Sequence, residues 1–124
     1  AYHYTLAKEL AALRSEGVMI IASGNIVHNL RKIDWPHLED AGFGYDWAVE
    51  FNEKIKKLIL DGNHQQIIDI EKTDLNYRYA VPSPDHFLPL LYILAIQTQD
   101  DKLSFFNDSL VGGSLSMTSL LLEQ

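Results

Sequence analysis

Hydrophobic and polar positions alternate along the chain with two different periods, and these predict helices interspersed with strands. Leu6, Leu10 and Leu13 recur at helical spacing, and Gly17 follows as a helix stop. Residues 18–22 then form a continuous apolar run, Val-Met-Ile-Ile-Ala, which is typical of a buried strand. The opening therefore predicts helix, turn and strand, which is the second half of a βαβ unit whose first strand is absent.

The middle of the chain predicts a long amphipathic helix over residues 45–60. Trp47, Phe51 and Ile55 lie on one face of it with Leu58 and Ile59, charged residues lie elsewhere, and Gly62 follows the end. Before this helix, residues 31–44 carry proline and glycine among polar residues, which indicates an irregular loop. After it, residues 63–71 predict a shorter helix and residues 74–81 a connection.

The last part of the chain predicts one more helix and two strands. Ser83, Pro84 and Asp85 form an ordered helix start, with the serine as cap, and residues 87–96 are apolar nearly all round. That helix should be buried against a sheet. Residues 103–107 and 115–122 are candidate strands around a Gly-Gly turn. The alternation favours an α/β fold.

Composition narrows the function classes. The 124 residues, 47% of them hydrophobic and 22% charged, suffice for one domain with a real core. A net charge of -7 argues against a nucleic-acid partner, because phosphate contacts need clustered Lys and Arg. The absence of cysteine fits a reducing cytoplasm, and no apolar stretch approaches the roughly 20 residues of a membrane span. Because the chain begins at Ala1 without methionine, we expect it to be the interior of a longer protein.

Two of the five histidines have a context that suggests chemistry. His28 lies in a polar turn directly after the apolar run, where α/β proteins place ligand sites. His86 lies in the first turn of a helix, where the helix dipole favours the neutral imidazole that binds metals. Each histidine also has a purely structural explanation. His28 could hold its loop together by hydrogen bonds to the backbone, and His86 could be a partly buried capping residue of its helix.

Together the two histidines suggest a metal, but their spacing alone is a weak signal. A non-haem iron site takes two histidines and a carboxylate. Asp85 adjoins His86, yet neighbours on a helix point about 100° apart, so Asp85 is better explained as a first-turn charge than as a co-ligand.

Three motifs resemble one family in order along the chain. They are Ser-Gly-Asn-Ile-Val-His-Asn-Leu-Arg at residues 23–31, Pro-Asp-His-Phe-Leu-Pro-Leu-Leu-Tyr at residues 84–92, and Gly-Ser-Leu-Ser-Met at residues 113–117. The chain resembles the C-terminal half of the 4,5-DOPA extradiol dioxygenase-like proteins of the class III extradiol ring-cleavage superfamily. The resemblance implies that residues 1–124 are one half of a single catalytic domain, a three-layer α/β/α sandwich with a mixed central sheet.

The resemblance also implies a chemistry. His86 matches a metal ligand, and His28 matches an active-site histidine that acts as acid and base and in some members counts as a ligand. The expected substrates are a catechol-type diol, DOPA-like, and O2, with Fe(II) for activity; zinc, which such proteins can carry, is redox-inert. The family's other histidine ligands lie in an N-terminal half that this chain lacks, so that half is an expected partner and the 124 residues alone are expected to be inactive.

Two other functions remain open at this point. A metal-bound water flanked by histidines could hydrolyse an ester or amide. Alternatively, the chain is an inactive fragment with a structural or interaction role. The sequence leaves the particular catechol, the native metal and the oligomeric state open.

Overall fold

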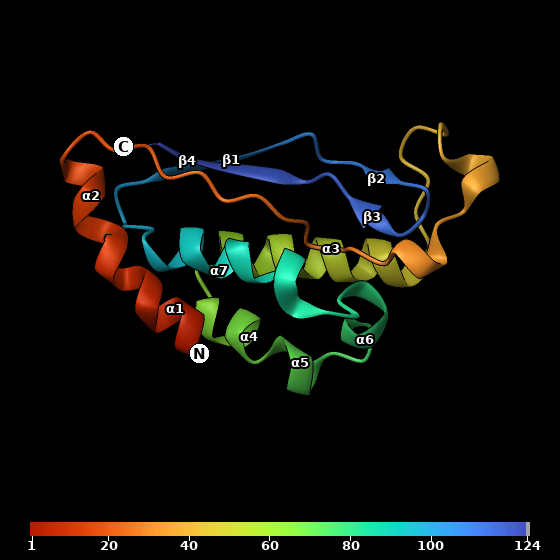
Figure 1. Cartoon of the computed structure of the whole chain (residues 1–124), viewed down its shortest axis with the longest axis horizontal. Coiled ribbons are helices and arrows are strands. Elements are labelled where there is room, and N and C mark those ends of the chain that lie inside the picture. Colours follow the sequence, from red (N-terminus) through yellow and green to blue (C-terminus); the bar gives the residue numbers. More distant parts are fainter. Residues whose placement is uncertain (124) are drawn as a thin grey trace.

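Helix α3 (Asp46–Leu60) organises the core of the chain, for which the computed structural model describes residues 1–123. Its apolar face buries Ala48, Phe51, Ile55, Leu58 and Ile59, which confirms the helix expected over residues 45–60. This face packs against Leu91 and Leu94 of helix α7 (Leu88–Ala95) and against short helices on the other side. Figure 1 shows both α3 and α7 beneath the strands.

The other helical elements are one to two turns long. They comprise α1 (Tyr2–Ala7), η1 (Lys8–Leu10), α2 (Ala11–Ser15), η2 (Leu30–Lys32), η3 (Trp35–His37), α4 (His64–Ile68), α5 (Ile70–Thr73), α6 (Tyr77–Ala80) and η4 (Pro84–His86). The first three follow one another without a break and give the helix expected at the N-terminal end. The helix expected over residues 63–71 is divided between α4 and α5, and the expected connection at 74–81 contains α6. Within the described residues, none of the helices combines the length and apolar character needed to cross a membrane.

The strands form two small antiparallel sheets. Strand β1 (Lys102–Phe106) pairs with β4 (Ser119–Glu123), with Ser104 opposite Leu121, and β2 (Leu110–Val111) pairs with β3 (Leu115–Ser116). The strand expected at 103–107 is confirmed to within one residue, whereas the one expected at 115–122 is interrupted between β3 and β4. Helices and strands together confirm the α/β class.

The prediction of a buried strand at residues 18–22 is wrong for this chain. The segment is extended, but it joins neither sheet. Its side chains are largely exposed, with Met19 81% and Ile21 82% accessible. A strand needs a partner backbone, and residues 1–123 do not place one beside this segment.

The helix start at Ser83 also differs from the prediction. Ser83 precedes the 3₁₀ turn η4, but its hydroxyl donates to the carboxylate of Asp85 instead of capping a backbone N–H. Helix α7 is not buried all round, since only Leu91 and Leu94 are fully enclosed. Pro89, Leu90 and Ile93 of α7 line a groove.

A buried ion pair fixes the N-terminal helices to the end of α7. The Arg14 guanidinium donates to both carboxylate oxygens of Asp101, at 2.7 Å each, and also to the carbonyl of Ile96 at 2.7 Å. The side chain of Asp101 is fully inaccessible and that of Arg14 is 12% exposed. The hydrogen bond from Arg14 lowers the pKa of Asp101 below its usual range.

Substituting Asp101→Asn should lower the free energy of unfolding by about 3 kcal/mol at pH 7, because one partner of a buried pair then stays uncompensated. Since the folded-state pKa of Asp101 is lowered, the stabilisation is complete above the ordinary carboxyl pKa of about 3.9 and is lost as the pH falls further. Urea unfolding across pH measures both effects. Asp61→Asn, which breaks the exposed Lys57–Asp61 pair, is the matched control and should change stability by less than about 0.5 kcal/mol.

Candidate active site

The backbone of residues 25–29 holds His28 between two distant parts of the chain. The amide of His28 donates to the carbonyl of Ala80 at 2.8 Å, and the amide of Asn29 donates to that of Ser114 at 3.1 Å. On the other side, His28 forms an antiparallel bridge with Leu115. The loop is therefore fixed from both sides, and the His28 ring projects from a rigid support.

His86 is brought beside this loop by a close backbone approach. It lies at the end of η4, and its carbonyl accepts the amide proton of Asn25 at 2.8 Å. A Cβ on Gly24 would lie 2.2 Å from the same carbonyl oxygen. Only glycine fits there, so Gly24 permits the contact that joins the two motifs.

The rings of His28 and His86 stack on each other. Their centroids are 3.6 Å apart and their planes differ by only 6°. The two histidines that the sequence singled out, 58 positions apart, thus meet in one place. The side chain of His86 is 41% exposed and His28 is half-buried, so both rings remain within reach of a ligand.

Asn25 determines which nitrogen of His86 carries the proton. Its Nδ2 donates to the carbonyl of Ser116 at 2.7 Å, which orients Oδ1 toward Nδ1 of His86, 3.3 Å away. An amide oxygen only accepts, so Nδ1 of His86 must be the donor. In the neutral ring, Nε2 then keeps its lone pair free.

The surroundings of His28 disfavour its charged form. Burial, and next the neighbouring His86, lower the pKa of His28 below its ordinary value. Asp85 lies on the other side of His86, with Oδ2 3.5 Å from Nε2, and its own pKa is lowered, mainly by the hydrogen bond from Ser83. A neutral imidazole can accept a proton or bind a metal.

The donors in this chain fit part of a metal site. Within residues 1–123, no group of three or more His, Asp or Glu side chains is arranged to hold an ion. An imidazole binds a metal in the plane of its ring, about 2.0–2.1 Å from the nitrogen. In the stacked arrangement, an ion in the plane of one ring lies outside the plane of the other. As placed here, the two histidines therefore do not chelate one ion together.

The sequence alone did not identify Asn25 as a contact of His86. Asn25 contacts both the carbonyl and the ring of His86, and it connects to Ser116, 91 positions away. The signal in the sequence was Gly24, because a glycine often marks a place where another part of the backbone approaches closely.

The chain matches a known family over nearly its full length. Residues 1–118 match the family described as the catalytic LigB subunit of aromatic ring-opening dioxygenase. A 4,5-DOPA dioxygenase extradiol of Escherichia coli K12 is 39% identical over 97% of this chain and 44% of its own length. A protein of the same name from Beta vulgaris is 30% identical over 95% of this chain and 42% of its own length.

A solved structure shares the arrangement of the helices and strands. The crystal structure of an uncharacterized protein from Escherichia coli K12 superposes with a TM-score of 0.84 at 34% sequence identity. The superposition covers 96% of this chain and 48% of that one. The chain thus spans less than half the length of the relatives and of the structure that it matches.

Proposed function

The chain belongs to the family of the catalytic LigB subunit of aromatic ring-opening dioxygenases, and from this premise we propose that it forms the C-terminal half of an extradiol dioxygenase that cleaves a catechol-type ring with O2. The stacking of His28 on His86 is the observation that supports this proposal. The other half of the catalytic domain, with further metal ligands, would come from the N-terminal half of the same protein. The complete domain would be a three-layer α/β/α sandwich with a mixed central sheet.

We assign His86 as the metal ligand of this half, through Nε2. The assignment rests on the contact to Asn25, which holds the proton on Nδ1 and leaves the lone pair of the neutral ring on Nε2, 3.5 Å from the Asp85 carboxylate. If bound there, a ferrous ion would supply the Lewis-acid and redox chemistry through which O2 reacts with the catechol, which itself provides the electrons. Zinc could occupy the same donors without that redox chemistry.

We assign His28 as the acid and base instead of a second ligand. Its ring is stacked on the His86 ring, so the two imidazoles as placed here are not arranged as a pair of ligands to one ion. Its lowered pKa keeps it neutral near pH 7, so a ring nitrogen can take the proton of a catechol hydroxyl and later return it. The fixed loop from residue 25 to residue 29 holds it in place during both transfers.

Oxygen uptake tests the proposed reaction. Iron-loaded longer protein carrying this chain should consume one O2 per catechol and give a product that has gained both oxygen atoms. The zinc-loaded protein, and a catechol with one hydroxyl methylated, serve as controls that should give no uptake. Hydrolysis of an ester or amide without oxygen uptake would support the hydrolase instead, and protein that holds no metal and turns over nothing would support the inactive fragment.

Removing the Asn25 side chain should weaken the metal site without removing a ligand. In Asn25→Ala, His86 loses the acceptor that fixes its tautomer, and metal affinity should fall roughly 10–100-fold. Metal titration measures the affinity, and ring ¹⁵N shifts of His86 report the tautomer. Asn76→Ala, which removes an exposed contact to Glu50, is the control and should change neither. An unchanged tautomer in Asn25→Ala would contradict this role.

A further inference from the structure

The Gly-Ser-Leu-Ser-Met motif at residues 113–117 lies directly against the loop that carries His28. Four polar residues of the described chain are buried together with their backbone, and they are Asn29, Asn52, Ser114 and Ser116. Among the described residues, every buried side-chain nitrogen and oxygen has a hydrogen-bond partner. A buried polar network whose members are all satisfied holds its parts in one arrangement.

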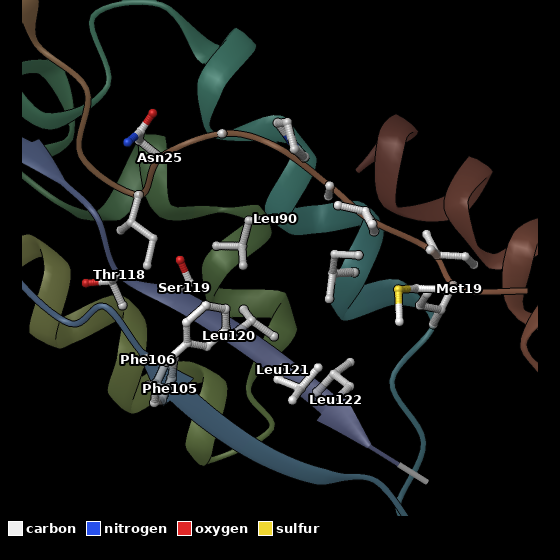
Figure 2. A pocket seen from close by; sticks show the side chains of 18 of the residues that line it. Met19, Asn25, Leu90, Phe105, Phe106, Thr118, Ser119, Leu120, Leu121 and Leu122 are labelled. Atoms are coloured by element: carbon white, nitrogen blue, oxygen red, sulfur yellow. The ribbon is translucent and has the colours of Figure 1, made fainter.

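The side chain of Asn25 takes the place of a backbone group in the pairing between this motif and the loop. The amide of Ser116 donates to the carbonyl of Val27 at 2.9 Å. In a regular antiparallel pair, the amide of Val27 would donate back to Ser116. Within the described residues that bond is not formed, and Nδ2 of Asn25 donates to the Ser116 carbonyl instead, at 2.7 Å. Figure 2 shows Asn25 and Thr118, two residues beyond Ser116, at the same end of the groove along α7.

The hydroxyl of Ser116 fixes this part of the motif to helix α3. It donates to Oδ1 of Asn52 at 2.6 Å, and Asn52 is only 3% exposed. The hydrogen bond from Lys56 is the main cause of the lowered pKa of Asp108, and a hydrogen bond from Asn52 contributes to it. Because a carboxylate only accepts, Nδ2 of Asn52 must face Asp108 and Oδ1 must face Ser116. The orientation of Asn52 is therefore set from both sides.

The contact between Asn25 and His86 is the member of this series that depends most on position. The hydrogen bonds from Asn25 to Ser116 and from Ser116 to Asn52 are short, at 2.7 and 2.6 Å. In contrast, Oδ1 of Asn25 lies 3.3 Å from Nδ1 of His86. A further displacement of about 0.3 Å would take this contact out of hydrogen-bond range. The atoms that hold Asn25 in place thus decide whether the contact forms.

We propose that Ser116, held on α3 by Asn52, is a positioning residue of the candidate site that acts through Asn25 and keeps the proton of His86 on Nδ1. Its effect on the tautomer does not depend on the proposed reaction. Its effect on metal affinity rests on the proposed function, in which Nε2 of His86 is a ligand. A purely structural role would lower the stability of the fold when the hydroxyl is removed and leave the His86 tautomer unchanged.

Ring ¹⁵N shifts of His86 in the metal-free longer protein test the proposal. In Ser116→Ala they should move toward those of Asn25→Ala, because the Ser116 carbonyl is no longer held against α3. The affinity for Zn²⁺, a redox-inert probe, should fall about 10-fold in a titration. This is the lower end of the range for a supporting residue, since Asn25 is retained. Ser116→Thr keeps the hydroxyl and should restore the parent shifts and affinity.

Ser114→Ala is the matched control. Ser114 is as buried as Ser116 and lies two positions before it, but its hydroxyl donates to the carbonyl of Asn29 at 2.8 Å, on the other side of the His28 bridge. Its loss should lower the Tm about as much as Ser116→Ala and leave the His86 shifts as in the parent. Equal His86 shifts in both variants would indicate a general loosening of the strand and would overturn the proposal.

Asn52→Ala tests the same path if Ser116→Ala does not fold. It removes the hydrogen bond from its other end, places a strong helix former in α3, and leaves the Ser116 hydroxyl as acceptor of the Thr118 amide at 3.3 Å. The His86 shifts should move as in Ser116→Ala, and a folded Asn52→Ala protein with parent shifts would reject the role of Ser116. Moved shifts in a protein whose parent consumes no oxygen would reject the proposed reaction and support this role.

Discussion

Replacing His86 by alanine in the longer protein should remove the metal, and with it all ring cleavage. Nε2 of His86 is the donor with a free lone pair that the geometry of this chain offers, and its orientation is fixed by Asn25. Loss of a direct ligand should cost more than the roughly 10–100-fold in affinity that a supporting residue costs. Metal analysis of the purified variant, followed by oxygen uptake with a catechol, measures the effect.

The His86→Ala variant should remain folded, because the side chain is 41% exposed and does not belong to the hydrophobic core cluster. An unchanged Tm of the metal-free proteins would confirm this. His37→Ala is the matched control, since His37 is exposed and its ring lies beside Asp34 and Phe43. It should keep both metal and activity. A His86→Ala protein that binds iron as the parent does would overturn the ligand assignment.

The sequence predicted well those features that depend on local periodicity. Helix α3 begins one residue after its expected start and ends where expected, because its apolar face repeats every turn and Gly62 follows it. The same reasoning predicted, wrongly, that residues 18–22 form a buried strand. Their composition is that of a buried strand, but burial and pairing depend on a partner backbone that the sequence of this segment does not contain.

The sequence identified the histidines of the candidate site but not how they are arranged in space. The motifs marked His28 and His86 from their immediate neighbours. That the rings stack, and that Asn25 joins His86 to Ser116, depends on contacts between residues that are 58 to 91 positions apart. Periodicity and spacing do not report such contacts. The stacking, in turn, is what separates the proposed roles of the two histidines.

Replacing His28 by alanine should abolish ring cleavage while leaving the metal content largely intact. General acid and base catalysis contributes roughly 10²–10⁴-fold to a rate, and the turnover of the iron-loaded variant should fall by that factor. Metal content should persist because the stacked rings do not present His28 and His86 as a pair of ligands, which leaves His86 as the proposed ligand of this half. Iron content and oxygen uptake are measured on the same preparation, with His37→Ala as control. The comparison separates loss of metal from loss of catalysis.

The pH dependence gives an independent test of the same role. Burial lowers the pKa of His28, so its neutral form, the competent base, should persist below the ordinary imidazole value of about 6.5. In the parent protein, kcat/KM should therefore fall only at more acidic pH, and this acidic limb should be missing from the residual activity of His28→Ala. If the variant instead loses its metal in proportion to its activity, His28 belongs to the coordination shell, and the rings must unstack when the longer protein binds its ion.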